Sequence, residues 1–159
     1  MQQFDPNLPN LMTGEITTVV VQDPANTFGA PFEVGNHVLD RTEPFRVHVR
    51  WTLDGLLVPL WQKALEDSDW DVSVYAESMG GGNEIRLGTE TVDVDVFRRN
   101  YEATIDVAGN VLQEHQPNSN QSGVYKLVVA VFLNSDLGQP GFDLTGFAEG
   151  PFIQVEDPQ

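Results

Sequence analysis

The sequence predicts an all-β protein with two antiparallel sheets packed face to face, seven or eight strands and one short helix near residues 59–66. Most of the candidate strands alternate apolar and polar residues with a period of two, which is typical of a half-buried strand. Clusters of Gly, Pro, Asn and Asp separate these segments at short intervals. No helix follows each strand in turn, so the pattern excludes a βαβ arrangement.

The central strand is predicted within the segment 122–133, because Val, Tyr, Leu, Ala and Phe follow one another there with only one charged residue, Lys126. The other candidate strands alternate more strictly. The clearest is 45–53, in which Phe45 and Trp51 lie on one face while His48 and Arg50 lie on the other. The remaining candidates are 15–22, 70–77, a short return strand at 85–87, 89–97, 101–107 and 144–155.

Two segments differ from this pattern. After Pro59, a suitable first helical residue, the apolar side chains of Leu60, Trp61, Ala64 and Leu65 form a stripe that predicts a helix of about two turns across one end of the sheets. The break at Gly150 and Pro151 in the last strand predicts a bulge or an edge position. Residues 24–44, rich in Gly and Pro, predict an irregular connection.

The chain of 159 residues fits one domain, predicted over 15–157, and residues 1–14 read as an extended N-terminal arm. The apolar residues of this arm either pack on a neighbouring surface or belong to a frayed terminus. No stretch approaches the roughly 20 apolar residues that a membrane span needs, and no signal segment begins the sequence. We therefore expect a cytoplasmic protein.

The formal net charge is −16, from 8 Lys and Arg against 24 Asp and Glu. Such a surface repels nucleic-acid phosphates and acidic membranes, so we expect neither as a partner. The composition fits an acidic protein of any source and also a protein adapted to a salty cytoplasm. The chain has no cysteine, which excludes disulfides, thiolate nucleophiles and sulfur-ligated zinc.

The segment Ser122-Gly123-Val124-Tyr125-Lys126-Leu127 resembles the corner that opens the sixth strand of immunoglobulin-like domains. The resemblance implies an immunoglobulin-like sandwich in which the hydroxyl of Tyr125 bonds back to nearby backbone. The paired cysteines of that family are absent, since Leu127 stands where the second would be, and a helix after Leu53 is atypical. A likeness of this kind implies a fold and no function.

Strand 45–53 is expected to pair with 101–107, and 101–107 with 89–97. That order places Arg46, His48 and Arg50 alongside four carboxylates, which are Glu102, Asp106, Asp93 and Asp95. The outer face then carries either a solvated charge ladder or a platform for a charged ligand. His48 lies between two arginines, which disfavours its protonation and its use as a base paired to a carboxylate.

Carboxylates alternate after the helix at Asp67 and Asp69, as they do in calcium loops. The positions that would hold the Gly and Glu of a helical calcium loop hold Val72 and Ser78 instead. The segment is therefore either an acidic turn or part of a non-helical calcium site completed from another loop. The predicted metal ligands are Asp67, Asp69, Asp136 and Asp143, and no other cofactor is expected.

No nucleophile, histidine or phosphate-loop motif is present, so the sequence predicts that the chain is not an enzyme. The favoured function is a non-catalytic interaction or structural module, self-associating or part of an assembly, with a protein partner that includes a second copy as an option. Its predicted contact residues are Phe4, Leu8, Leu11, Leu137, Phe142 and Phe147. The alternative is a sandwich that binds calcium or carbohydrate through its end loops, with Trp61, Trp70 and Tyr75 as a stacking surface.

Overall fold

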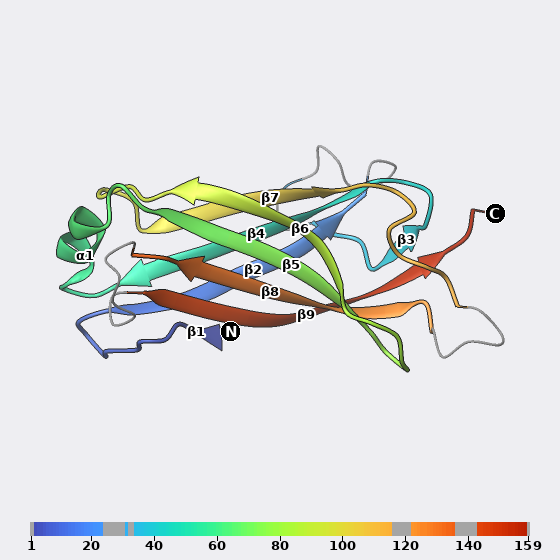
Figure 1. Cartoon of the computed structure of the whole chain (residues 1–159), viewed down its shortest axis with the longest axis horizontal. Coiled ribbons are helices and arrows are strands. Elements are labelled where there is room, and N and C mark those ends of the chain that lie inside the picture. Colours follow the sequence, from blue (N-terminus) through green and yellow to red (C-terminus); the bar gives the residue numbers. More distant parts are fainter. Residues whose placement is uncertain (1, 24–30, 32–33, 116–121, 136–142, 159) are drawn as a thin grey trace.

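The computed structural model describes residues 2–23, 31, 34–115, 122–135 and 143–158. These residues form nine strands and one short helix, which confirms an all-β fold (Figure 1). The elements in chain order are β1 (Gln2–Gln3), β2 (Thr13–Gln22), β3 (Val38–Asp40), β4 (Phe45–Asp54), α1 (Val58–Ala64), β5 (Asp69–Ser78), β6 (Ile85–Asp93), β7 (Asn100–Val107), β8 (Val124–Leu133) and β9 (Leu144–Glu156).

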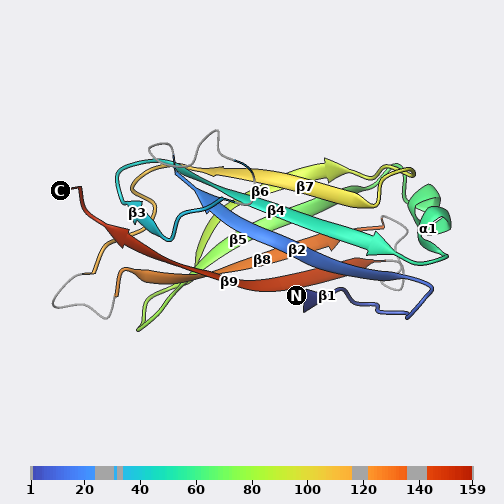
Figure 2. The same ribbon diagram turned by 180° about the vertical axis from the view of Figure 1, so that it is seen from behind.

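The strands form two sheets that lie on either side of one core (Figures 1 and 2). Sheet A has the order β1-β2-β4-β7, and sheet B has the order β3-β9-β8-β5-β6. Neighbouring strands are antiparallel, with one exception among the described residues: β3 runs parallel to β9. The expectation of purely antiparallel sheets is therefore wrong at this edge, where a three-residue strand after an irregular connection pairs with the end of the chain.

Strand β8 occupies the middle of sheet B, as the sequence predicts. Its inward side chains are buried and its outward ones only half-buried, so the strand has one core face and one partly covered face. The core between the sheets includes a cluster of aromatic rings, in which Trp51 of β4 meets Trp70 of β5 edge to face at 5.7 Å and stacks on Tyr101 of β7 at 5.6 Å. This cluster joins the two sheets near α1.

The N-terminal segment closes one side of the molecule by bridging both sheets. The backbone N–H of Phe4 donates to Gly14 of β2 at 2.8 Å, and Asp5 exchanges two backbone hydrogen bonds with Thr145 of β9. Phe4 fills the core between them and is only 2% exposed. A Cβ atom at Gly146 would lie 2.2 Å from the Phe4 ring, so glycine is needed there to admit the ring.

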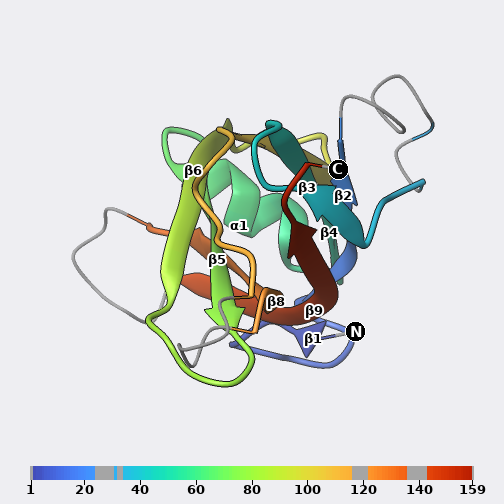
Figure 3. The same cartoon turned by 90° about the vertical axis from the view of Figure 1, so that its right-hand side faces the viewer.

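Helix α1 covers one end of the sheets, as predicted, which Figure 3 shows along the long axis. The predicted apolar stripe is only partly correct. Leu65, just after the helix, is buried, but Leu60 is 70% exposed and the polar Gln62 is buried in its place. Gln62 is accommodated because its amide nitrogen donates to the Tyr101 hydroxyl at 2.7 Å and to the Arg98 carbonyl. No helix among the described residues could span a membrane.

The segment 85–97 differs from the prediction of two strands. It forms one strand, β6, which ends at Asp93 and pairs with β5 in sheet B. Strand β7 lies at the edge of sheet A, and Gly88 of β6 faces Ile105 of β7 across the core, where an added Cβ would come within 2.6 Å of the isoleucine. The predicted pairing of 89–97 with 101–107 is therefore wrong, since alternation alone does not say which sheet a strand joins.

The predicted irregularity in the last strand is confirmed. Lys126 of β8 pairs with Phe152 of β9, but Val128 pairs with Glu149, so β9 has an extra residue opposite β8 at Gly150 and Pro151. Gly150 has a φ of 99°, a conformation that favours glycine. The strand lies between β8 and β3, and the break therefore reflects a bulge inside the sheet.

Candidate functional site

The outer face of sheet A carries a ladder of three cross-strand pairs between β4 and β7. Arg46 lies opposite Asp106, His48 opposite Thr104 and Arg50 opposite Glu102. The Nε atom of Arg46 donates to Asp106 at 3.1 Å, and that of Arg50 donates to Glu102 at 3.2 Å. The predicted pairing of 45–53 with 101–107 is confirmed. Asp93 and Asp95 are absent from the ladder, because β6 belongs to the other sheet.

His48, in the middle of this ladder, is 8% exposed although it points away from the core. Both of its ring nitrogens have partners. Nδ1 lies 2.8 Å from the hydroxyl of Thr104, and Nε2 lies 2.8 Å from the side-chain oxygen of Gln22 at the end of β2. Thr104 itself is exposed. The three side chains therefore form a line from a buried amide, through an imidazole, to a hydroxyl at the surface.

The orientation of the Gln22 amide fixes the tautomer of His48. The amide nitrogen of Gln22 donates to the carbonyl oxygens of Pro31 at 3.0 Å and Val34 at 2.7 Å, so its oxygen must face the imidazole. An amide oxygen can only accept, and Nε2 of His48 therefore carries a proton and donates. In the neutral ring Nδ1 is then the acceptor, and the Thr104 hydroxyl donates to it.

Burial lowers the pKa of His48 below 6.5, its usual value, and the positive charges of Arg46 and Arg50 lower it further. Glu102 and Asp106 act in the opposite direction and raise the pKa, Glu102 by more than Arg50 lowers it, but burial and Arg46 have the largest effects. The imidazole is therefore neutral at pH 7. This agrees with the prediction that two flanking arginines disfavour protonation, and it means that Nδ1 can accept a proton from Thr104.

A groove of about 540 Å³ opens on the same face next to this line of residues. Its wall includes Arg50 of β4 and Glu102 of β7, and Glu102 precedes Thr104 by two residues, which is about 7 Å along a strand. The other polar residues that line it are Thr17, Thr52, Asn100 and Arg98. Thr104 itself is not among the lining residues, and it lies at the next outward position after Glu102 on β7.

Together these residues have the parts of a nucleophilic site. A surface hydroxyl donates to a neutral imidazole, a second polar group orients that imidazole, and arginine side chains flank it. Sequence reasoning considered His48 but missed Gln22 and Thr104. The predicted pairing of β4 with β7 placed Thr104 on the strand next to His48, but no sequence pattern gives the register between these two strands. Nothing in the sequence marks Gln22, which contacts His48 from a third strand, β2.

The predicted calcium ligands do not converge in the part of the chain that the structure describes. Asp69 starts β5, and Asp143 just precedes β9 on the far side of β8, which is two strand spacings or about 10 Å away. The Asp143 side chain accepts a hydrogen bond from the backbone of Ser135 at 2.9 Å. Within these described segments no three His, Asp or Glu side chains are placed to hold a metal. Asp136 lies outside the described residues, and calcium binding stays a prediction.

The predicted contact residues fall in different places. Phe4 belongs to the core of its own chain, so it is not free to contact a partner in this fold. Leu8 and Leu11 are partly exposed beside the turn that precedes α1, where Leu11 accepts a backbone hydrogen bond from Leu57 at 2.8 Å. Phe147 is 54% exposed on β9. Leu137 and Phe142 lie outside the described residues.

The predicted stacking surface for carbohydrate is not assembled. Trp70 is fully buried in the aromatic cluster of the core, while Trp61 and Tyr75 are half-buried on α1 and β5. The reason is the alternation of β5, which points Trp70 inward and Tyr75 outward.

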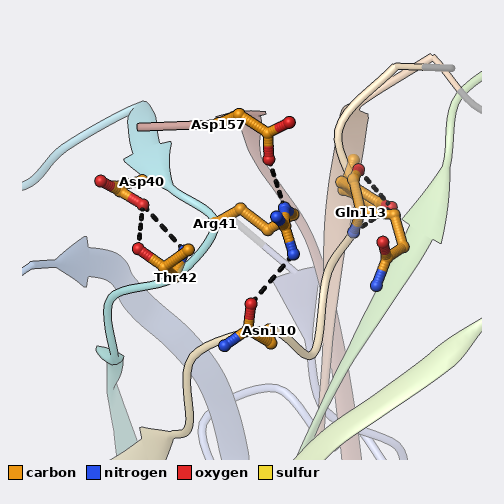
Figure 4. A network of polar contacts seen from close by, with 7 residues as sticks. Asp40, Arg41, Thr42, Asn110, Gln113 and Asp157 are labelled. Atoms are coloured by element: carbon orange, nitrogen blue, oxygen red, sulfur yellow. Dashed lines mark hydrogen bonds and ion pairs between the residues drawn. The ribbon is translucent and has the colours of Figure 1, made fainter. Parts of the chain in front are cut away.

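A second polar cluster lies at the opposite end from α1 and joins the C-terminal segment to two loops (Figure 4). Arg41 donates to Asp157 and also to the side-chain oxygen of Asn110 at 2.9 Å, and Asp40 accepts from the backbone and hydroxyl of Thr42. The bond from Arg41 lowers the pKa of Asp157, while a hydrogen bond with Asp157 raises the pKa of Glu114. These contacts hold the C-terminal segment and the two loops together.

No family model and no curated protein sequence matches the chain. Among solved structures, the similar ones include the superoxide reductase (neelaredoxin) from Ignicoccus hospitalis, at 13% identity and a TM-score of 0.37, over 89% of this chain and 82% of that chain. A variant of the same superoxide reductase (neelaredoxin) from Ignicoccus hospitalis is similar at 15% identity and a TM-score of 0.40, over the same shares of the two chains.

These neighbours are enzymes, and they contradict the prediction of a non-catalytic, self-associating module as well as the prediction that the chain is not an enzyme. Both predictions are therefore wrong. The sequence reasoning looked for catalytic motifs of fixed spacing, whereas the residues around His48 come from three strands far apart in the chain. At these TM-scores the likeness assigns neither a reaction nor a cofactor to this chain.

Proposed function

We propose that the chain is an acyl hydrolase, with Thr104 as nucleophile, His48 as general base and Gln22 as the residue that positions His48. The observation that carries the proposal is the pair of 2.8 Å contacts that join the Thr104 hydroxyl, the His48 ring and the Gln22 amide. A hydroxyl, a base within hydrogen-bonding distance and a group that orients the base are the parts that nucleophilic acyl transfer requires.

The reaction consists of two proton-balanced steps. In the first, Oγ1 of Thr104 attacks the carbonyl carbon of an ester as its proton passes to Nδ1 of His48, and the alcohol then leaves with that proton. In the second, water attacks the acyl group on Thr104, gives a proton to His48 and releases the acid, after which Thr104 recovers its proton. Arg46 and Arg50, whose Nε atoms donate to Asp106 and Glu102, flank His48 and supply positive charge near the oxyanion in both steps.

The groove favours a polar substrate. Apart from Trp51 and Tyr101, it is lined by hydroxyl, amide and charged side chains, with both signs of charge present in Arg50 and Glu102. An ester whose acyl or alcohol part carries hydroxyl groups would meet hydrogen-bond partners there, whereas a long hydrocarbon chain would not.

Hydrolysis of p-nitrophenyl acetate and of acetylated sugars by the full chain tests the proposal. Thr104→Val keeps the shape and β-branching of the side chain but removes its hydroxyl, and we expect a rate loss of at least about 100-fold. Thr104→Ser retains the hydroxyl and should retain activity. Thr89→Val is the matched control, because the Thr89 hydroxyl is also exposed and contacts another hydroxyl, that of Ser73, at 3.1 Å, but no imidazole.

A covalent probe gives a second readout. A fluorophosphonate should form an adduct on Thr104, detected by mass spectrometry of the peptide, and His48→Gln should abolish the adduct while preserving hydrogen-bonding capacity. If Thr104→Val and Thr89→Val hydrolyse the ester at the same rate, or if the adduct forms elsewhere, then His48 and Thr104 only support Gln22, which binds the carbonyl oxygens of Pro31 and Val34, and the proposal is wrong.

We also infer that the two-sheet body is of the immunoglobulin-like kind. The support is the hydroxyl of Tyr125 at the start of β8, which accepts a hydrogen bond from the backbone N–H of Gln113 at 3.1 Å and donates to the carbonyl oxygen of the same residue at 2.9 Å. This is the backbone contact that the resemblance at residues 122–127 implies for Tyr125.

A further inference from the structure

The end of the molecule that carries α1 exposes an unusual number of large apolar side chains. Phe97, in the connection from β6 to β7, is 95% exposed, and Leu56 and Leu60 are 79% and 70% exposed. Figure 1 shows α1 and the connection between β6 and β7 together at this end. The two are joined by the hydrogen bond from Gln62 of α1 to the carbonyl of Arg98, the residue after Phe97.

A hollow of about 700 Å³ lies beside Phe97, between the segment after α1 and the end of β6. Four carboxylates line it, and they are Glu66, Asp67, Asp93 and Asp95. Ser68 holds the two sides together, because its carbonyl accepts a hydrogen bond from the backbone of Val94 at 3.3 Å. An exposed aromatic ring therefore borders an acidic hollow.

The negative charge of this hollow is only partly neutralised. Lys63 pairs with Glu66 at 2.7 Å, and Arg98 approaches Asp95 at 4.0 Å. Asp67 and Asp93 form no ion pair or side-chain hydrogen bond with another residue in the described part of the chain. Asp93 also lies directly opposite Asp69 across β5 and β6, so two like charges face each other. A cation at this position would relieve that repulsion.

We propose that this surface, formed by Leu56, Leu60, Phe97, Asp67 and Asp93, binds a basic amphipathic segment of another protein. Apolar side chains of the segment cover Phe97 and the two leucines, and its Lys or Arg side chains pair with Asp67 and Asp93. Charge decides between the possible occupants. A second copy of a chain with a net charge of −16 would be repelled, as would an acidic membrane surface, whereas a basic segment is attracted.

The probe for this surface is a synthetic peptide of about 14 residues made of Leu and Lys, with Leu on one face of the helix. Its fluorescein-labelled form is titrated with the full chain and followed by anisotropy. One companion peptide has Glu in place of Lys, and a second has Ser in place of Leu. We expect the Leu and Lys peptide to bind about tenfold tighter or more than either companion at about 50 mM NaCl, and binding to weaken at about 500 mM.

Two variants locate the binding. Phe97→Ser should weaken binding by about tenfold or more, while Phe152→Ser, which removes a 52% exposed ring from β9, should leave it unchanged. Asp67→Asn combined with Asp93→Asn should also weaken binding by about tenfold. Its control is Glu43→Gln combined with Glu84→Gln, which removes the same charge from exposed positions in the β3–β4 and β5–β6 connections. Figure 1 shows both connections at the end opposite α1.

Several outcomes would overturn the proposal. Equal losses for the two double variants would mean that the peptide responds only to net charge. Tight binding of the Glu companion, or no effect of Phe97→Ser, would remove the proposed contacts. Concentration-dependent dimers in sedimentation velocity that disappear in Phe97→Ser would make a second copy the occupant. Binding to zwitterionic vesicles that is lost in the same variant would make it a membrane. The ester hydrolysis proposed above does not enter these measurements.

Discussion

Phe4 and Trp70 meet edge to face in the core, with ring centroids 5.9 Å apart and ring planes at 64°. Phe4 comes from the N-terminal segment and Trp70 from β5, so this contact joins the first residues of the chain to sheet B. Trp70 in turn contacts Trp51 and Tyr101, which belong to sheet A. The aromatic cluster that holds the two sheets together therefore begins at residue 4.

We predict that Phe4→Ala lowers the free energy of unfolding by about 3 to 5 kcal/mol, because the substitution leaves a cavity lined by Trp70 and the glycines that admit the ring. Urea denaturation followed by tryptophan fluorescence measures this. Phe147→Ala, at a ring that is largely exposed, is the control and should cost less than about 0.5 kcal/mol. Equal losses would mean that the N-terminal segment does not pack on its own chain.

The prediction for the N-terminal segment shows what sequence patterns do and do not reveal. Residues 1–14 show no periodic pattern of apolar residues. Phe4 lies between the two-residue strand β1 and the single bridge from Asp5 to Thr145 of β9, and both elements are too short to produce a period. The longer strands β4, β5, β7 and β8 were predictable, because period-two alternation reports one buried face. Alternation does not report the sheet to which a strand belongs, which is why β6 was paired with β7.

The candidate site was less predictable than the fold. The alternation of β4 placed His48 between two arginines, and the lowered pKa followed in direction from that placement. Its burial did not follow, because the alternation of β4 does not show that Gln22 of β2 contacts the imidazole, with its amide nitrogen bonded to the carbonyl oxygens of Pro31 and Val34. The orientation of α1 was not predictable either. Leu60 lies on the solvent-exposed side of the helix, because Gln62 and not an apolar residue faces the core.

His48 gives a prediction about pH. Its pKa is lowered in the folded chain and returns to about 6.5 on unfolding, so between these two values the unfolded chain binds more protons. The contribution of His48 to stability is therefore fully present above pH 6.5 and is lost as the pH falls through the lowered value. We expect the difference in unfolding free energy between the natural chain and His48→Gln to shrink below pH 6.5. A constant difference from pH 8 to pH 5 would contradict the lowered pKa.

The same group sets a prediction for activity. Ester hydrolysis requires neutral His48, so the rate should fall as the pH drops below 6.5, through the lowered pKa of the folded chain. Replacing Arg46, the charge with the largest lowering effect on the pKa, by Gln should move the fall in rate to higher pH. An unchanged pH profile in this variant would show that His48 is not the base.

Tyr125→Phe tests the hydroxyl at the start of β8. The variant removes both hydrogen bonds to the backbone of Gln113, and the N–H and C=O of Gln113 lose their partners, so we expect a loss of about 1 to 3 kcal/mol in unfolding free energy. Tyr75→Phe is the control, because its side chain is only half-buried on the outer face of β5. Thermal melting compares them. A Tyr125→Phe variant as stable as Tyr75→Phe would mean that the tyrosine ring alone, without its hydroxyl, holds the connection between β7 and β8.

Gln62 and Tyr101 form a buried polar pair whose energetics can be separated by a double-mutant cycle. The amide of Gln62 donates to the Tyr101 hydroxyl at 2.7 Å, and that hydroxyl donates to the carbonyl of Asp95 at 3.1 Å, so the pair anchors the connection that carries Phe97.

Gln62→Leu leaves the Arg98 carbonyl without the donor that Gln62 supplies, and should lower the free energy of unfolding by about 1 to 3 kcal/mol. The double variant with Tyr101→Phe should cost less than the sum of the two single variants, by about 1 kcal/mol, because the hydrogen bond from Gln62 to the Tyr101 hydroxyl is lost in both single variants and is counted twice in their sum. Strict additivity in urea denaturation would mean that the two side chains do not interact.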